Sequence, residues 1–303
     1  MDETSQYALQ ASGLTFAYPG SAPVFSGLDL AVPEGSVFGL LGANGIGKST
    51  LMKVLMGLLP RKGGAVSLFG SPIRQEAFHQ VGVLIEGPNL YPHLSGLDNL
   101  MVMATYRGVG RDRAVEVLEL VGLEGHAGKL ARHYSTGMKQ RLGIAMALLH
   151  RPRLLLMDEP ANGLDPAGIV DVRSLFRRLN REEGMTIFLS SHLLSEVEQS
   201  CTHLGILAPG RLAYQGALEG ARRQLPAGVR LRILCRPADR ALDVLRAAGL
   251  DAGLSEKGAL QLPLSGKKEA NLVIDLLRGA NIDIYELATE EDSLEDFFLS
   301  LYQ

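Results

Sequence analysis

The chain has 303 residues, which allows one large domain or a large domain with a small one. Its composition, 46% hydrophobic and 21% charged, is that of a globular protein, and a formal net charge of -3 argues against a strongly basic surface for nucleic acid. Cys201 and Cys235 have neither metal-type nor redox-type spacing. We expect no signal peptide and no membrane span, because no apolar run reaches roughly 20 residues. Work at a membrane would then require another chain as the anchor.

The N-terminal part of the chain consists of short β-type runs separated by turns. Strands are predicted at Leu14–Tyr18, Leu28–Val32, Val37–Leu41 and Ala65–Phe69. Val37–Leu41 is continuously apolar, and glycines and then the helical stretch Ser49–Met56 follow it. A buried strand, a glycine loop and a helix in this order indicate an α/β unit.

Helical periodicity replaces the β pattern between Ser95 and Leu149, which predicts a helical subdomain at about residues 88–150. Strand–helix alternation then resumes. The predicted elements are strands at Leu154–Met157, Thr186–Leu189, Leu204–Leu207 and Leu212–Tyr214, and helices at Ala167–Leu179 and Leu193–Gln199.

A segment rich in Gly, Ala, Arg and Gln, residues 216–228, predicts a boundary between a first domain, 1–220, and a C-terminal accessory α+β domain, 221–303. The second part has the pattern strand, helix, two short strands, helix, strand, which resembles a ferredoxin-like fold. Its predicted elements are Val229–Cys235, Asp239–Ala248, Gly253–Ser255, Ala259–Leu262, Lys267–Arg278 and Ile282–Leu287, followed by a last helix that carries Leu294, Phe297, Phe298 and Leu301 on one face.

The segment from Gly42 to Thr50 contains the pattern G-x-x-x-x-G-K-[ST]. Glycines allow positive φ and turn backbone N–H groups towards an anion, and the following helix directs its positive end there. Lys48 would supply a cation for the β- and γ-phosphates of ATP, and the Ser49 hydroxyl is a ligand type that suits Mg²⁺. A chance glycine turn before a helix is the alternative that this motif alone leaves open. The predicted nucleotide-binding residues of this loop are Gly42, Asn44, Gly45, Gly47, Lys48, Ser49 and Thr50.

The apolar run Leu154–Met157 ends in two carboxylates, Asp158 and Glu159. Charge at the end of a buried strand costs free energy unless it is paired, and a metal–nucleotide site would pair it. Asp158 is predicted to hold Mg²⁺, directly or through water, and Glu159 to act as the general base for the attacking water.

Together with further motifs, the chain from about Leu14 to Gly216 resembles the nucleotide-binding subunits of ABC transporters. The signature segment Tyr134–Arg141 resembles the one that opens a helix in that family, Asn162–Asp165 resembles the loop that couples two subunits, and Ser190–His192 follows an apolar strand. The resemblance implies a P-loop α/β ATPase domain with a mixed sheet and a helical subdomain. It implies four further roles: adenine stacking by Tyr18, catalytic contact of His192 with the γ-phosphate, capping of that phosphate by Ser135 and Gly137 in trans, and dimer coupling by Asp165.

The resemblance also implies partners and a place of action. These are a second ATP-binding subunit in a head-to-tail dimer, most simply a homodimer, and a membrane-spanning permease. The cofactors would be ATP and Mg²⁺, no nucleic acid is expected, and the chain would lie in the cytoplasm against the inner face of the membrane.

Two positions depart from the family pattern. The signature reads Tyr-Ser-Thr-Gly-Met where Leu-Ser-Gly-Gly-Gln is common, although Ser135 and Gly137 remain. Glu86 stands where the family usually has a Gln that reaches Mg²⁺. Because an ionised carboxylate only accepts hydrogen bonds and adds negative charge, we expect Glu86 to bind Mg²⁺ at least as strongly as Gln.

Glu86 and the run Gly-Met-Lys-Gln-Arg-Leu-Gly are similar to the ATPases of bacitracin and lantibiotic exporters. The leading hypothesis is therefore the energy-coupling ATPase of an exporter for a peptide antibiotic or a drug-like substrate. The alternatives are a soluble ABC-type ATPase that acts on ribosomes or DNA, and an inactive binding module. The single phosphate loop, the absence of a long heptad run and the negative charge disfavour the first. Lys48, Asp158, Glu159 and His192 disfavour the second.

Overall fold

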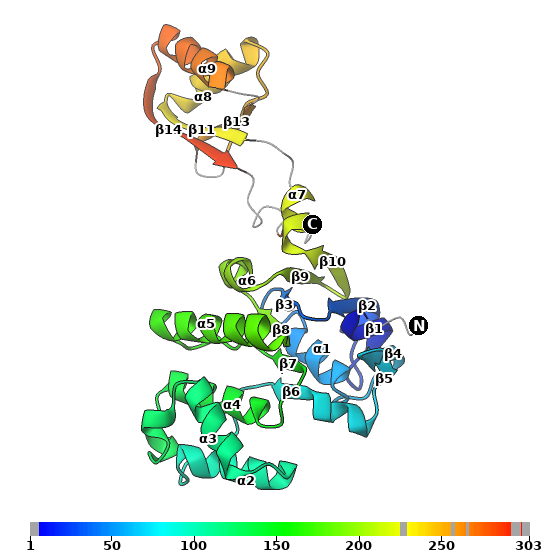
Figure 1. The fold of residues 1–303 in the computed structure, drawn as a ribbon. Helices are drawn as coiled ribbons and strands as arrows, with labels where there is room; N and C mark the ends of the chain where they lie inside the picture. The colour runs from blue at the N-terminus through cyan, green and yellow to red at the C-terminus, as the bar shows by residue number, and fades with distance from the viewer. Residues whose placement is uncertain (1–5, 225–228, 256–257, 265–266, 292–297, 299–303) are drawn as a thin grey trace. The chain divides into compact units, whose positions relative to one another are not determined.

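The computed structural model describes residues 6–224, 229–255, 258–264, 267–291 and 298. The chain divides into two compact units, and the division falls after Leu218, close to the boundary predicted after residue 220. Figure 1 shows the helices and strands of both units. We call them the N-terminal unit and the C-terminal unit.

The centre of the N-terminal unit is a six-stranded sheet with the order β10-β9-β3-β8-β7-β6. All neighbouring strands are parallel except β9 and β10, which form an antiparallel hairpin. The strands β3, β7 and β8 are buried along their whole length, which explains the continuous apolar runs of β3 and β7. The bounds are β3 Val37–Leu41, β6 Val81–Leu84, β7 Leu154–Met157, β8 Thr186–Ser191, β9 His203–Ala208 and β10 Arg211–Ala217.

A four-stranded antiparallel sheet, β2-β1-β4-β5, packs together with helix α1 (Lys48–Leu55) and the six-stranded sheet around one core. That core contains Leu9 and Leu30 from the antiparallel sheet, Leu51 from α1, and Phe38 and Phe188 from the larger sheet. The strand bounds are β1 Tyr7–Phe16, β2 Phe25–Pro33, β4 Gly63–Leu68 and β5 Ser71–Pro72. The prediction of a mixed α/β fold is confirmed.

Two further helices, α5 (Pro166–Glu183) and α6 (Leu194–Ser200), pack against the six-stranded sheet. Both contact β8, and α6 also contacts β3. The first of these helices begins where the Asp165 side chain accepts a hydrogen bond from the backbone N–H of Gly168, at 2.9 Å.

The helices α2 (Gly96–Arg107), α3 (Arg111–Leu120) and α4 (Thr136–Leu148) pack against one another, and α4 also packs against β6. They gather on one side of the N-terminal unit in Figure 1, within the range 88–150 for which a helical subdomain is predicted. Short 3-10 helices lie at Gln75–Gln80, Glu124–His126 and Ala131–His133. Within the described part of the chain, no helix is both long enough and apolar enough to cross a bilayer.

The C-terminal unit has the element order strand, helix, two strands, helix, strand, and its sheet order is β12-β13-β11-β14. This is the ferredoxin-like arrangement. Apolar residues of β11 pack against α8 and α9, with Leu231, Leu245 and Leu277 fully buried. The predicted last helix falls outside the described residues, except for residue 298. The bounds are α7 Leu218–Gln224, β11 Val229–Arg236, α8 Ala238–Ala247, β12 Gly253–Leu254, β13 Leu260–Leu264, α9 Lys267–Gly279 and β14 Asp283–Glu291.

Strand β6 was not predicted from the sequence, and it forms the edge of the six-stranded sheet beside β7. Gly82 in this strand lies directly against α4, because a Cβ added there would collide with the backbone carbonyl oxygen of Ala147. The close approach of two backbones joins the helical subdomain to the sheet.

We expect Gly82→Ala to lower the free energy of unfolding of the N-terminal unit by about 1–3 kcal/mol, because backbone atoms cannot rotate away from the added methyl group. Gly125→Ala is the control, since a Cβ there would meet no atom within 4 Å. Urea denaturation followed by circular dichroism measures both. Equal stability of the two variants would contradict the close approach.

Candidate nucleotide site

A cavity of about 750 Å³ is lined by the segments that directly follow β3, β7 and β8. The carboxyl ends of parallel strands meet at one edge of a sheet, where ligands of α/β folds bind. Gln140 of the signature segment and Asn162 of the coupling loop also line the cavity, although neither was predicted individually as a site residue. The predicted site residues that line it are Asn44, Gly45, Gly47, Lys48, Ser49, Thr50, Glu86, Asp158, Glu159 and His192.

Two different constraints require glycine in the phosphate loop: a positive φ at some positions and close packing at another. Gly45 and Gly47 have φ values of 78° and 111°, and Gly47 immediately precedes α1. These conformations favour glycine and leave the first N–H groups of the helix directed at the cavity. Gly42 does not line the cavity, and a Cβ there would lie 2.9 Å from Ile46 Cγ2 and 3.2 Å from the Leu207 carbonyl oxygen. Close packing is thus the reason for a glycine at this position, and nucleotide binding by Gly42 stays a prediction.

Lys48 is a buried cation with three oxygen partners. Only 5% of its side chain is exposed. Its Nζ donates to the carbonyl oxygens of Gly42 at 2.8 Å and Ala43 at 3.2 Å, and it lies 3.2 Å from Glu159 Oε1. A buried charge requires such partners, which hold the ammonium group at the cavity wall.

The second oxygen of Glu159 lies 2.8 Å from His192 Nδ1. Because an ionised carboxylate only accepts hydrogen bonds, Nδ1 carries the proton in this pair, and Nε2 is the ring nitrogen left for another partner. One carboxylate therefore joins Lys48 and His192. The backbone of Glu159 has a φ of 45°, which is rare for a residue other than glycine and common at functional sites.

Ser190, near the end of β8, contacts the carboxylate of Asp158 and the backbone of Glu159. Its hydroxyl donates to Asp158 Oδ1 at 2.6 Å and accepts the backbone N–H of Glu159 at 2.9 Å. It is fully buried. The sequence contained this residue in the motif Ser190–His192 but gave it no function, because its contacts depend on the pairing of β7 with β8.

Glu86 lines the cavity, and its carboxylate is paired with Lys53 of α1. The hydrogen bond to Glu86 raises the pKa of Lys53, while burial has a smaller opposing effect. Glu86 is 67% exposed at its side chain and has a φ of 63°, and Gly87 beside it has a φ of 83°. A metal contact by Glu86 would compete with this ion pair.

Tyr18 lies outside the lining of the cavity, next to the phosphate loop. Its hydroxyl is 3.1 Å from Thr50 Oγ1, and its ring meets Phe16 edge-to-face, with centroids 4.9 Å apart. The residue is 41% exposed, so one part of the ring packs and another is open to a ligand.

The predicted residues Ser135, Gly137 and Asp165 line a second hollow, of about 380 Å³. Ser135 caps α4, since its hydroxyl accepts the backbone N–H of Met138 at 3.2 Å. None of the residues that line this hollow also lines the first cavity. The structure therefore brings together the phosphate loop, the acidic strand end and the histidine, whereas Ser135 and Gly137 of the signature segment lie in a separate hollow.

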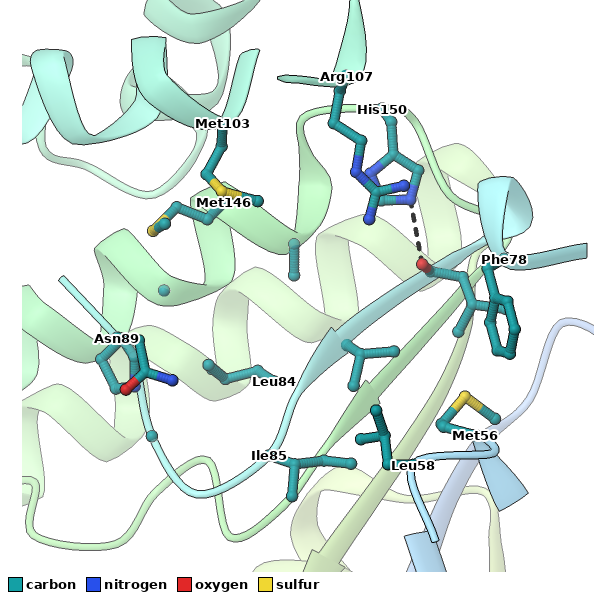
Figure 2. Close-up of a pocket in the computed structure, with 16 residues that line it drawn as sticks. Met56, Leu58, Phe78, Leu84, Ile85, Asn89, Met103, Arg107, Met146 and His150 are labelled. Carbon is teal, nitrogen blue, oxygen red and sulfur yellow. Dashed lines mark hydrogen bonds between the residues drawn. The ribbon is translucent and has the colours of Figure 1, made fainter. Parts of the chain in front are cut away.

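A third depression, which we call the apolar groove, has a volume of about 460 Å³ and lies between β6, α2 and α4. Figure 2 shows Met103, Met146 and Leu84 among its lining side chains and Arg107 beside His150 at one end. Two of its lining residues, Leu58 and Val83, are 63% and 36% exposed. Exposed apolar side chains beside an apolar hollow are a feature of interaction surfaces.

The model of the ABC transporter family matches residues 25–162. The bacitracin transport ATP-binding protein BcrA of Bacillus licheniformis is 35% identical over 297 residues, which are 97% of this chain and 96% of that protein. The chain belongs to the ABC transporter family. It is an ATP-binding subunit with ATPase activity.

Two other comparisons agree with this membership. The lantibiotic transport ATP-binding protein SrtF of Streptococcus pyogenes is 39% identical over 202 residues, 67% of this ABC ATPase and 88% of that protein. The solved structure of cbiO1 from Clostridium perfringens, part of the ABC transporter complex cbiONQ, has a TM-score of 0.67 at 26% identity, covering 72% of this chain and 92% of that one. None of these findings favours the alternative of an ATPase that acts on ribosomes or DNA.

We expect Ser190→Ala to lower the ATPase rate of this ABC ATPase by about tenfold or more, because a hydrogen bond to a charged group contributes about 1.5–3 kcal/mol. Ser174→Ala, which removes an exposed hydroxyl bonded only to the Val170 carbonyl, is the matched control. Steady-state ATP hydrolysis at saturating ATP measures both. An unchanged rate in Ser190→Ala would refute an orienting role.

Proposed function

We propose that this chain powers an exporter of a peptide antibiotic or drug-like compound by hydrolysing MgATP in the cavity that the phosphate loop lines. The observation that carries the proposal is the chain of contacts from Lys48 through Glu159 to His192 at 3.2 and 2.8 Å. It joins a phosphate-binding cation, a carboxylate base and an imidazole in one place. The relatives with transport names supply the substrate class, since they act on bacitracin and lantibiotics.

In this proposal, the N–H groups at the start of α1 and the Lys48 ammonium bind the β- and γ-phosphates. The γ-phosphate competes with Glu159 for Lys48 and so releases the carboxylate to accept a proton from the attacking water. His192, held through Nδ1 by Glu159, presents Nε2 to the γ-phosphate. Tyr18 would stack on adenine with the exposed part of its ring.

The cavity suits Mg²⁺, because the Ser49 hydroxyl and the Asp158 carboxylate are hard oxygen donors that both line it. Ser49 and Asp158 would hold the ion, which when bound neutralises charge on the phosphates. Ser190 keeps Asp158 in one orientation for this purpose. Glu86 is a third proposed ligand, in competition with Lys53.

We further propose that two copies pair head to tail. Ser135 and Gly137 lie in a hollow separate from the phosphate loop, so they can reach a γ-phosphate only in another subunit. The N-terminus of α4 would then face the anion. Asp165 shares that hollow and would couple the two subunits. Twofold symmetry makes both sites equivalent in a homodimer.

The apolar groove is the proposed docking place of the membrane-spanning permease, which would hold this chain against the inner face of the membrane in the cytoplasm. It adjoins the cavity, because Gly87 lines both. Residues 221–303 form a proposed accessory domain, since none of the residues that line the cavity belongs to them. No nucleic acid is part of the proposal.

Glu159→Gln tests the proposal directly. We expect the ATPase rate to fall by about 100-fold or more, the range that general base catalysis contributes, while ATP binding remains. The control is Glu119→Gln, which changes an exposed carboxylate of α3. Hydrolysis and nucleotide affinity are measured on the same preparations. Turnover at the parental rate in Glu159→Gln would remove Glu159 as the base.

Substitutions of Glu86 and Lys53 give a second test, because they should shift the half-saturating Mg²⁺ concentration in opposite directions. Glu86→Gln should raise the half-saturating Mg²⁺ concentration for hydrolysis if Glu86 binds the metal. Lys53→Met should lower it, because the carboxylate loses its competing cation. On the Glu86→Gln background, Lys53→Met should have no further effect. A Mg²⁺ titration in which Glu86→Gln causes no rise would contradict metal binding by Glu86.

A further inference from the structure

One end of the apolar groove contains a cation that lacks a partner. Arg107, the last residue of α2, is half-buried and lines the groove. Among the residues that the structure describes, none forms an ion pair or a hydrogen bond with its guanidinium group. The described lining of the groove also includes no Asp or Glu. A guanidinium left without a partner becomes costly once a docked segment excludes water from it.

His150 provides a second unsatisfied group at the same end. Its Nε2 lies 3.1 Å from the Val81 carbonyl oxygen, as the dashed line in Figure 2 shows. A carbonyl only accepts, so Nε2 donates the proton and Nδ1 is an acceptor in the neutral ring. Nδ1 is buried and has no hydrogen-bond partner among the described residues.

The surroundings of His150 keep this ring neutral and this end of the groove positive. Burial is the main cause that lowers the pKa of His150, and the charges of Arg107, His79 and Arg113 lower it further, against the raising effect of the Val81 carbonyl. Arg113 already has a partner in Glu116, at 2.6 Å. Among the described residues that line the groove, Arg107 is therefore the cation that remains for a ligand.

We infer that Arg107 binds a carboxylate of the membrane subunit, carried at one end of an otherwise apolar docking helix. The inference rests on the proposed function and adds the chemistry of the partner segment. The groove accepts the apolar face of the helix, and the guanidinium fork matches a carboxylate with two parallel hydrogen bonds. The carboxylate then fixes the direction in which the helix lies.

The test measures the affinity of this chain for the membrane subunit that co-purifies with it, after each is purified separately in detergent. Arg107→Met keeps the apolar stem and removes the charge. We expect its dissociation constant to rise about 30-fold or more, because truncating one partner of a buried charge pair has an effect of this size. Arg107→Lys should lose less than Arg107→Met. Arg111→Met, at the exposed start of α3, is the matched control and should bind like the parent.

The ATPase rate of the isolated chain should be unchanged in Arg107→Met, which also shows that the variant is folded, because Arg107 does not line the cavity. The partner residue is then found by charge reversal. Arg107→Glu should weaken binding, and changing one Asp or Glu of the membrane subunit's cytoplasmic helices to Lys should restore it. Failure of every such reversal to restore binding would overturn the inference.

Two further outcomes would overturn the inference in distinguishable ways. If Met103→Asp abolishes binding and Arg107→Met leaves it unchanged, the groove is the docking place but no carboxylate is recognised. If neither variant affects binding, the docking proposal fails as well. Vesicles of phosphatidylglycerol are the third arm: loss of vesicle binding in Arg107→Met, with unchanged affinity for the membrane subunit, would assign the cation to lipid phosphate instead.

Discussion

The buried ammonium group of Lys48 is the constraint on which the site depends. With 5% exposure, it must find oxygen atoms within the protein, and it finds them in the loop after β3 and in the carboxylate after β7. The same carboxylate holds His192 after β8, so one charge fixes three strand ends relative to one another. The hydroxyl of Ser190 completes the arrangement through its hydrogen bonds to the Asp158 carboxylate and to the backbone N–H of Glu159.

The sequence predicted the strands whose burial is nearly complete. Val37–Leu41 and Leu154–Met157 have the predicted bounds, because both faces of these strands are covered and every residue is apolar. Membership in the ABC family and the mixed α/β fold were predicted as well, since the glycine loop and the acidic strand end occur at fixed positions in the chain. The roles of the individual site residues remain proposals.

Tertiary contacts explain what the sequence could not predict. Val81–Leu84 is a strand only because β7 pairs with it and α4 covers it. Four residues with a central glycine carry no β periodicity that stands out. The pairing of Glu86 with Lys53 joins residues 33 positions apart, and the hydrogen bond between His150 Nε2 and the Val81 carbonyl joins residues 69 positions apart. Local patterns contain no information at such separations.

The methionines of the apolar groove affect how this chain and the membrane-spanning permease could change together during evolution. Met56, Met103 and Met146 have unbranched, polarisable side chains that adapt to neighbours of different shape. Substitutions on the apolar face of a docked helix would therefore be tolerated without a compensating change in this chain. Arg107 allows no such drift, because its planar fork has fixed geometry. The apolar face of the docked helix could thus change its shape during evolution, whereas the position of the one charge that pairs with Arg107 would stay under selection.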